Sequence, residues 1–347
     1  MDSKDRVEML KADASYWWAN SMVLKIFAAA LLLYLLLATV LAFLWSGEPP
    51  TFNVLQNAVE RSEAENRIVV PGSVTTATLV ALAETLLDKP GGFLSNDITL
   101  PGAGLDNMPN WEFGVLVQVR DLARSMRQGF SRSQSQSTED VDLALAEPRF
   151  NFDNDSWIFP RSEDEYREGV NYTLEYLWRL SDPSQAGSQF FTRADNLVNW
   201  LATVESRLGS LSQRLSASVG QRRLNTDLAG DAEASQSTLS EEDQMVKTPW
   251  NEIDDVLYEA RGTSWALVHC LQAIEIDFAD VLQKKNALVS MRQIVRELEA
   301  TQQTIWSPIV LNGSGFGLFA NHSLVMASYI SRANAGIIDL RELLTKG

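Results

Sequence analysis

The sequence predicts an all-α protein: an N-terminal transmembrane helix followed by an elongated antiparallel helical bundle with long ordered loops. Three observations lead to this prediction. One unbroken apolar run lies near the N-terminus, long stretches repeat apolar residues every three or four positions, and clusters of glycine and proline separate those stretches. We therefore expect the regions 1–25 (cytoplasmic leader), 26–45 (transmembrane anchor), 46–185 (periplasmic helical and loop-rich region) and 186–347 (antiparallel long-helix bundle with a polar connector at 225–248).

The apolar run extends from Ile26 to Trp45. About 20 apolar residues at 1.5 Å per residue are enough to cross the roughly 30 Å hydrocarbon core of a bilayer. No charged residue interrupts the run between Lys25 and Glu48, which argues against a core helix of a soluble protein. The residues expected to anchor the helix in the bilayer are Lys25, Tyr34 and Trp45.

Basic residues predict the orientation of this helix. Four of them precede the run and none follows it before Arg61, and basic residues stay on the cytoplasmic side of a span. We therefore expect a single-pass membrane protein, with its N-terminus in the cytoplasm and the rest in the periplasm or another extracytoplasmic space. The alternative is a cleaved secretory signal, whose apolar region is usually about 7–15 residues long and ends at small residues. The bulky exit Phe43-Leu44-Trp45 argues against cleavage.

Charge limits the partners of the body. The chain carries 29 basic and 45 acidic residues, a net charge of −16, and the leader holds equal numbers of each sign. The acidic excess therefore belongs to the part after the anchor, where it argues against nucleic acid and against an anionic lipid surface. Basic or cationic partners suit this part better. Cys270 is the only cysteine of the sequence, so an intramolecular disulfide is excluded.

The first half of the body shows moderate helical patterns and two long loops. Gly47-Glu48-Pro49-Pro50 is expected to be a short, stiff exit from the membrane. Glycine and proline recur between Lys89 and Met108, which predicts a loop. The aromatic and turn-forming segment 147–160 is expected to be an ordered loop packed on the body. Helices are expected at 52–66, 73–88, 111–130 and 163–180.

The second half carries the strongest helical signal outside the anchor. Apolar residues alternate at spacings of three and four from Ala194 to Leu215, which predicts an apolar seam that a partner helix must cover. A similar seam begins at Leu267 and continues to Ile305, with a stammer-like slip near Leu288 and a possible break at 261–264, where Gly262 weakens a helix. A last helix is expected from Phe319 to Leu343. The polar connector 225–248 is the segment most typical of disorder.

No catalytic, cofactor-binding or metal-binding residue is predicted, and no cofactor. His322 lies on an apolar stripe, where a satisfied core histidine is favoured over a ligand. His269 and Cys270 are adjacent on a helix and point about 100° apart, so they are not expected to form a nucleophilic pair. The acidic clusters lack the spacing of a calcium loop, and the glycine-rich loops lack the lysine of a phosphate-binding loop.

Four motifs of the sequence resemble a proteobacterial family of single-pass inner-membrane proteins that is known only as a domain of unknown function. The resemblance covers most of the chain, including the apolar run. It implies an inner-membrane protein of a Gram-negative bacterium and implies no catalytic residue. The motifs are Asp88-Lys89-Pro90-Gly91-Gly92-Phe93-Leu94-Ser95-Asn96-Asp97, Asn110-Trp111-Glu112-Phe113-Gly114, the serine-rich 130–137 and Phe150-Asn151-Phe152-Asp153.

The loop and helix start at 90–113 is the candidate interaction surface. A loop of this length is uncommon in a compact body unless it is functional or disordered, and this one is too apolar for simple disorder. Two arrangements remain open: its apolar side chains pack on the parent bundle, or they anchor a partner. The candidate partner-binding residues are Phe93, Leu94, Leu105, Met108, Trp111 and Phe113.

The function expected from these features is a structural or protein-interaction module of the cell envelope, with an envelope protein or a second copy of the chain as its partner. The long seams and the lack of a catalytic motif favour this reading. The alternative is an envelope hydrolase in which two carboxylates from the loops 90–113 and 147–160 meet and carry out acid–base chemistry. The candidate carboxylates are Asp97, Asp106, Glu112 and Asp153.

Overall fold

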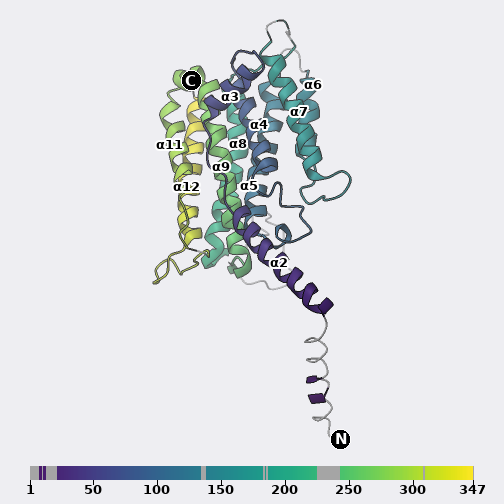
Figure 1. Ribbon diagram of the computed structural model, residues 1–347. Helices are drawn as coiled ribbons and strands as arrows, with labels where there is room; N and C mark the ends of the chain where they lie inside the picture. The colour runs from purple at the N-terminus through teal and green to yellow at the C-terminus, as the bar shows by residue number, and fades with distance from the viewer. Residues whose placement is uncertain are drawn as a thin grey trace, which may run out of the picture.

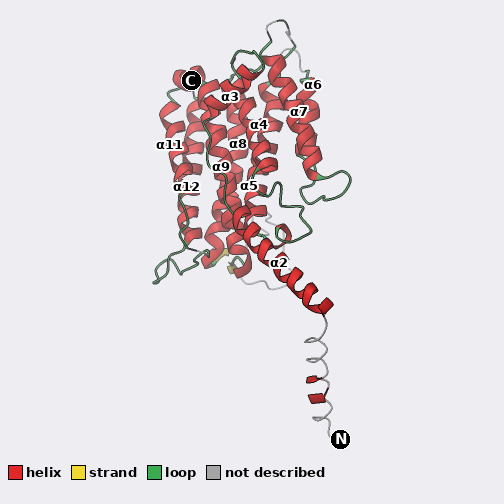
Figure 2. Cartoon of the chain, viewed as in Figure 1, coloured by secondary structure: helices red, strands yellow, loops and turns green. Residues whose placement is uncertain are grey.

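The computed structural model describes residues 8–9, 11–12, 22–133, 138–182, 184, 187–224, 243–307 and 309–346. Long helices lie side by side in a bundle, and one helix, α2, leaves the bundle obliquely at the end opposite the C-terminus (Figure 1). Helices and loops account for nearly all of the described chain (Figure 2). The predicted all-α class with an N-terminal apolar helix is therefore confirmed.

The first half of the chain contains the apolar helix and five helices of the bundle. A π-helical turn, Met126–Phe130, continues α5, and a short 3-10 helix, Gly102–Gly104, precedes it. These helices are α2 (Met22–Trp45), α3 (Val54–Ala64), α4 (Ser73–Asp88), α5 (Asn107–Ser125), α6 (Val141–Phe150) and α7 (Ser162–Leu180).

The second half contains the longest helices of the bundle. The strands β1 (Gln221–Leu224) and β2 (Asp243–Val246) pair antiparallel between α8 and α9 in the sequence. Two short 3-10 helices, Ala217–Val219 and Trp250–Glu252, flank them. The connector expected at 225–248 therefore contains a strand at its end, while 225–242 lies outside the described residues. The helices are α8 (Ala194–Ser216), α9 (Ile253–Asp277), α10 (Ala279–Lys284), α11 (Leu288–Ala300) and α12 (His322–Thr345).

Helix α9 runs through the centre of the bundle, where it contacts α4, α5, α8, α11 and α12. Every residue from Ala260 to Leu271 is buried, so this part of the helix has no solvent face. Gly262 is essential to that packing, because an added Cβ would lie 2.0 Å from the carbonyl oxygen of Trp111 on α5. The predicted break at 261–264 is therefore wrong: glycine serves close helix approach there, and α9 continues through it.

The break lies further along the chain. Helix α9 ends at Asp277, the short α10 follows, and α11 starts at Leu288 and packs back along α9 and α12. Lys285, which interrupts the apolar seam in the sequence, lies in this turn beside Asn286, which has a φ of 54°. The seam from 267 to 305 thus belongs to two antiparallel helices.

The spacing of apolar residues on α8 predicted that a partner helix covers its seam. That partner is α12. Leu201, Leu208 and Leu215 on α8 and Ile330, Ile337 and Leu344 on α12 are buried. The two helices run antiparallel, because Glu205 pairs with Arg341 whereas Ser212 contacts Ser331.

One hydrophobic core joins the two regions expected at 46–185 and 186–347. The main cluster of buried apolar residues extends from Leu79 on α4 to Leu344 on α12, and α5 packs along α9. The segment 147–160 differs from its prediction. Helix α6 extends through Pro148 to Phe150, and the loop after it exposes Trp157, Ile158 and Phe159 rather than packing them on the body.

Candidate functional site

A strap of chain, residues 46–53, connects α2 to the bundle and is bound tightly to α9. Both carboxylate oxygens of Glu48 accept hydrogen bonds from the guanidinium of Arg261, at 2.5 and 2.6 Å. Arg261 is buried and also donates to the carbonyl oxygens of Thr301 (2.8 Å) and Gln303 (3.0 Å). One arginine thus ties together the strap, α9 and the end of α11.

His269 provides a second attachment point for the strap. The backbone N–H of Phe52 donates to its Nε2 at 3.0 Å, so its Nδ1 carries the proton and donates to the carbonyl oxygen of Trp265 at 2.7 Å. The Phe52 ring stacks on the imidazole with 4.0 Å between ring centroids. Burial lowers the pKa of His269 to about 4, which keeps the ring neutral and able to accept this bond. The sequence gives no sign of this role of His269, because nothing in it shows that residue 52 lies over the imidazole.

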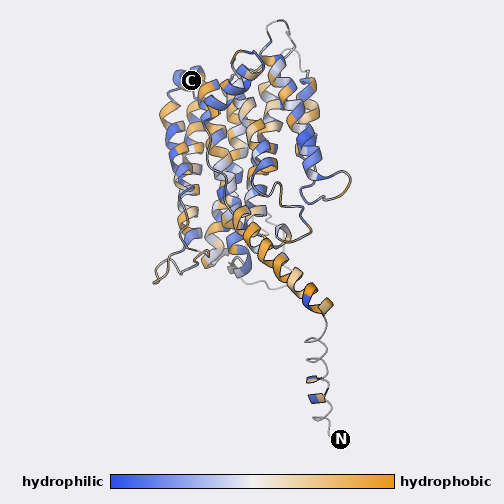
Figure 3. Cartoon of the chain, viewed as in Figure 1, coloured by the Kyte–Doolittle hydropathy of each residue, from blue (hydrophilic) through white to orange (hydrophobic). Residues whose placement is uncertain are grey.

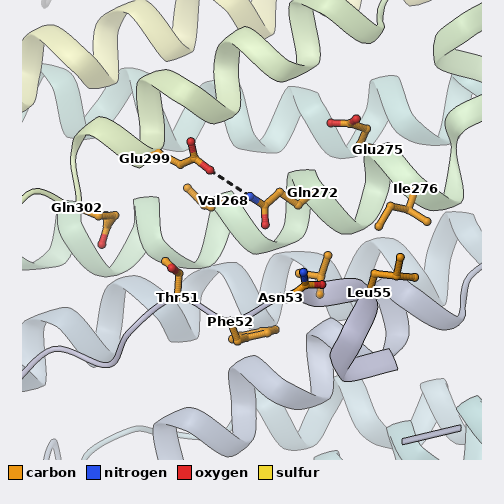
Figure 4. A pocket seen from close by; sticks show the side chains of 11 residues that line it. Thr51, Phe52, Asn53, Leu55, Val268, Gln272, Glu275, Ile276, Glu299 and Gln302 are labelled. Carbon is orange, nitrogen blue, oxygen red and sulfur yellow. Dashed lines mark hydrogen bonds between the residues drawn. The ribbon is translucent and has the colours of Figure 1, made fainter. Parts of the chain in front are cut away.

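A groove of about 780 Å³ lies along the strap, between the start of α3 and the helices α9 and α11. Figure 4 shows Glu299 and Glu275 on one wall and Phe52 and Leu55 on the other. Glu299 accepts a hydrogen bond from Gln272 at 3.2 Å, and Glu275 accepts one from Arg292 at 2.7 Å. The groove combines carboxylate and amide groups with apolar side chains.

Helix α2 is long and apolar enough to span a membrane, and Figure 3 shows it mostly in the colour of hydrophobic residues. Along α2, Ala38 is buried. The three anchor residues expected from the sequence differ in their surroundings. Lys25 is exposed near the start of the helix, whereas Trp45 lies against Gly91 at its end. The hydroxyl of Tyr34 donates to the carbonyl oxygen of Leu100 at 3.1 Å. The second half of α2 therefore runs beside the loop that precedes α5.

A family model described as an uncharacterized protein conserved in bacteria (DUF2333) matches residues 17–347. The chain belongs to this family. No curated protein and no solved structure matches the chain.

The candidate partner-binding residues of this DUF2333 protein lie mainly in its core. Phe93, Leu94, Met108 and Trp111 are buried, and Leu105 and Phe113 are half-buried. Of the two arrangements left open by the sequence, packing on the parent bundle accounts for the four buried side chains. In this conformation they are not exposed to a partner.

Glu112 explains why the loop folds inwards. Its carboxylate accepts the backbone N–H groups of Leu94 (2.8 Å) and Ser95 (2.9 Å) and forms a 2.5 Å ion pair with Lys89. Both charged side chains of the pair are almost completely buried. Burial raises the pKa of Glu112, against the opposing effects of Lys89 and the amide donors. The carboxylate that sequence reasoning considered for catalysis is occupied in holding the loop on α5.

The other candidate carboxylates have separate surroundings. Asp106 is exposed and caps α5 by accepting the N–H of Asn107 at 2.9 Å, and Asp153 is exposed on its loop. Asp97 is half-buried, and its pKa is raised by burial and then by the charge of Glu163. A hydrolase would need two of these carboxylates, one from each loop, to face one cavity. The surroundings of Asp97, Asp106, Glu112 and Asp153 do not favour that arrangement.

The remaining reactive side chains have structural roles. Cys270 is buried, and burial raises the pKa of its thiol to about 12. His322 is half-buried, and its Nδ1 accepts the N–H of Leu311 at 3.2 Å. Within the described residues, no group of three His, Cys, Asp or Glu side chains is placed to hold a metal ion.

Proposed function

We propose that the protein is a single-pass protein of the bacterial inner membrane that presents its helical body in the periplasm as a protein-interaction module of the cell envelope. The apolar helix α2, the basic residues before it and the absence of basic residues in 26–60 support this placement.

The observation that carries the proposal is the rigid connection between α2 and the bundle. A protein that only needed to be kept near a membrane would be served by a flexible linker. Here Glu48 is paired with the buried Arg261, and Phe52 is bound through both its backbone and its ring to His269. Such a connection fixes the orientation of the body relative to the anchor, which is what a scaffold needs in order to present a surface at a defined height.

The groove along the strap is the proposed partner site. Its carboxylate Glu299, which is bonded to the neutral amide of Gln272, and its exposed apolar residues, Leu55 and Ile276, suit a segment that carries both basic and apolar side chains. The second carboxylate of the groove, Glu275, is already paired with Arg292. The net charge of −16 favours a basic partner as well. We therefore propose a basic segment of another envelope protein as the occupant.

Cysteine labelling tests the orientation. An added side chain at Gly187 meets no heavy atom within 4 Å, so Gly187→Cys offers an exposed thiol, whereas the native Cys270 is buried. A membrane-impermeant maleimide should label the Gly187→Cys protein in intact spheroplasts and leave the wild-type protein unlabelled. Labelling of Gly187→Cys only after lysis would place the body in the cytoplasm and overturn the proposal.

Photo-crosslinking tests the groove. A benzoyl-phenylalanine at Leu55, which is 46% exposed in the groove, should form a defined adduct with a second envelope protein in living cells. The matched control is Leu145 on α6, which is 50% exposed and lies outside the groove. An adduct with the mass of two copies would identify self-association instead. Equal adducts at both positions, or none at Leu55, would contradict the assignment of the groove.

A further inference from the structure

The end of the body from which α2 emerges carries an unusual concentration of exposed apolar side chains. The loop 309–320 exposes Ile309, Phe316, Leu318 and Phe319, and Trp306 just before it is 92% exposed. Trp250, in the short 3-10 helix before α9, is 85% exposed. Single exposed apolar residues need no explanation, but a group of this size on one end of a protein marks an interaction surface.

These side chains lie at the same end as α2. Trp250 and Ile309 line one groove together with Tyr258 and Ile305, and the latter two also line the groove that contains Ser46 and the strap. Figure 1 shows the loop before α12 at the end of the bundle opposite the C-terminus, which is also the end that α2 leaves, although α2 extends towards the other side of the view. The exposed aromatic residues therefore lie at the end of the bundle that the apolar helix leaves.

A contact inside the apolar helix places part of the body at the depth of the bilayer. Tyr34 bonds to the carbonyl oxygen of Leu100. Tyr34 lies 11 positions before Trp45, which corresponds to about 17 Å along a helix. If the span ends at Trp45, the loop 98–101 must enter the lipid beside it. The composition of this loop is suitable, because its Ile98 and Leu100 are exposed and apolar.

The lack of charged residues in the loops at the α2 end favours lipid over a basic protein as the partner of this surface. No Asp, Glu, Lys or Arg occurs between Glu299 and Arg332, and none occurs between Asp97 and Asp106. In a chain with a net charge of −16, these are the segments that approach a lipid surface without electrostatic repulsion. Tryptophan is enriched at the membrane interface, and phenylalanine and leucine occur with it on the apolar faces that enter the interface.

We propose that the α2 end of the body is seated in the periplasmic leaflet of the membrane, with the loops 98–101 and 309–320 and the side chains of Trp250 and Trp306 inserted among the lipids. The proposal rests on the proposed spanning role of α2. It adds that the body is held at the bilayer surface by its own loops. Asp106 and Asp254, which line the groove behind Trp250, remain on the aqueous side.

The test uses the full-length protein in liposomes of zwitterionic lipid and places an environment-sensitive fluorophore on single introduced cysteines. Phe316→Cys and Ile98→Cys report on the two loops, and Leu37→Cys reports on α2. Val289→Cys is the matched control, because Val289 is 78% exposed on α11 and lies near the turn that contacts the C-terminus. Lipids with a nitroxide on the acyl chain serve as the quencher.

The proposal expects lipid nitroxide to remove most of the emission at positions 316, 98 and 37 and to leave the label at 289 unchanged. Emission at 316 as resistant as that at 289, with α2 quenched, would overturn the seating but not the span. Unquenched emission at 37 would overturn the proposed function itself. A blue-shifted label at 316 that resists nitroxide would show that a protein, such as a second copy, covers the loop, and would also overturn the seating.

Discussion

The α8–α12 pair and the α2 end of the body are stabilised by different kinds of interaction. The pair is stabilised by a regular apolar seam, in which residues such as Leu208 and Ile337 are completely buried. The α2 end depends on a few buried polar contacts, Lys89 with Glu112, Glu48 with Arg261, and Phe52 with His269. An apolar seam tolerates small changes of shape, whereas a buried polar contact fails as soon as one partner is lost. The two regions therefore differ in how a single substitution affects them.

The largest expected effect is a charge placed in the seam. Leu208→Asp would bury an unpaired carboxylate between α8 and α12 and is expected to cost on the order of 5 kcal/mol, since burial of an unpaired charge is among the most destabilising changes known. In a chain of this length each kcal/mol lowers the melting temperature by roughly 1.5 °C, because the entropy of unfolding grows with the number of residues. Thermal melting followed by circular dichroism measures the effect.

Ser206→Asp is the matched control, because Ser206 is exposed on the same helix. Ser212 is less suitable, since its hydroxyl lies 2.5 Å from that of Ser331 on α12. Equal melting temperatures for Leu208→Asp and Ser206→Asp would show that the α8–α12 seam is not formed.

The next largest effect is expected at the buried ion pair. Glu112→Gln leaves the ammonium of Lys89 buried without its partner, which typically costs about 3–5 kcal/mol. The double variant Glu112→Gln with Lys89→Met removes both charges and should recover part of the loss. As a surface comparison, Asp164→Asn breaks the exposed pair with Arg161 and should leave the melting temperature nearly unchanged.

If Glu112→Gln has the same melting temperature as Asp164→Asn, the buried pair of Lys89 and Glu112 does not stabilise the α2 end. If the double variant is no more stable than the single one, the stabilising role belongs to the amide donors of Leu94 and Ser95 rather than to the ion pair.

The same contrast explains what the sequence could predict. The seam of α8 repeats every three or four residues and can be recognised without knowing its partner, so its burial followed from spacing alone. Glu112 offers no such pattern, because its ligands lie in a loop about 18 positions earlier and meet it only in three dimensions. For that reason the burial of Phe93 and Leu94 remained open at the level of the sequence.

The central helix shows a second limit. Gly262 on α9 was interpreted as a break, because glycine lowers helix propensity, but a close neighbour such as Trp111 requires the same residue type. Local propensity cannot separate these two uses of glycine. The strap contacts were also beyond reach, since Phe52 and His269 are 217 positions apart in the sequence.

Acid should weaken the attachment of the strap. Because the pKa of His269 is about 4 in the folded protein and 6.5 in the unfolded chain, its contribution is fully present above pH 6.5 and is lost as the pH falls towards 4. The shift corresponds to about 3 kcal/mol at 1.36 kcal/mol per pKa unit. His269→Gln retains an acceptor for the N–H of Phe52 but cannot be protonated.

Melting temperatures of the wild type and of His269→Gln between pH 7 and pH 4 test this prediction. The wild type should lose more stability than the variant over this range. The comparison of the two proteins is needed because burial raises the pKa values of Glu112 and Asp277, which affects stability in the opposite sense. Parallel pH profiles would show that His269 is not the titrating group.

Substitutions in the loop 309–320 should have the smallest effect on stability. They should have a large effect on whether this end of the body stays in contact with lipid. Phe316 and Leu318 are fully exposed, so replacing both by Asp removes no packing and should change the free energy of unfolding by less than about 0.5 kcal/mol. The same change places two charges where we propose that the loop meets lipid. A fluorophore at Trp306→Cys should then lose its quenching by lipid nitroxide, while a label at Leu37→Cys keeps it. A clear drop in melting temperature would mean that the loop packs on the body, and unchanged quenching at position 306 would mean that the loop does not help to hold the body in the membrane.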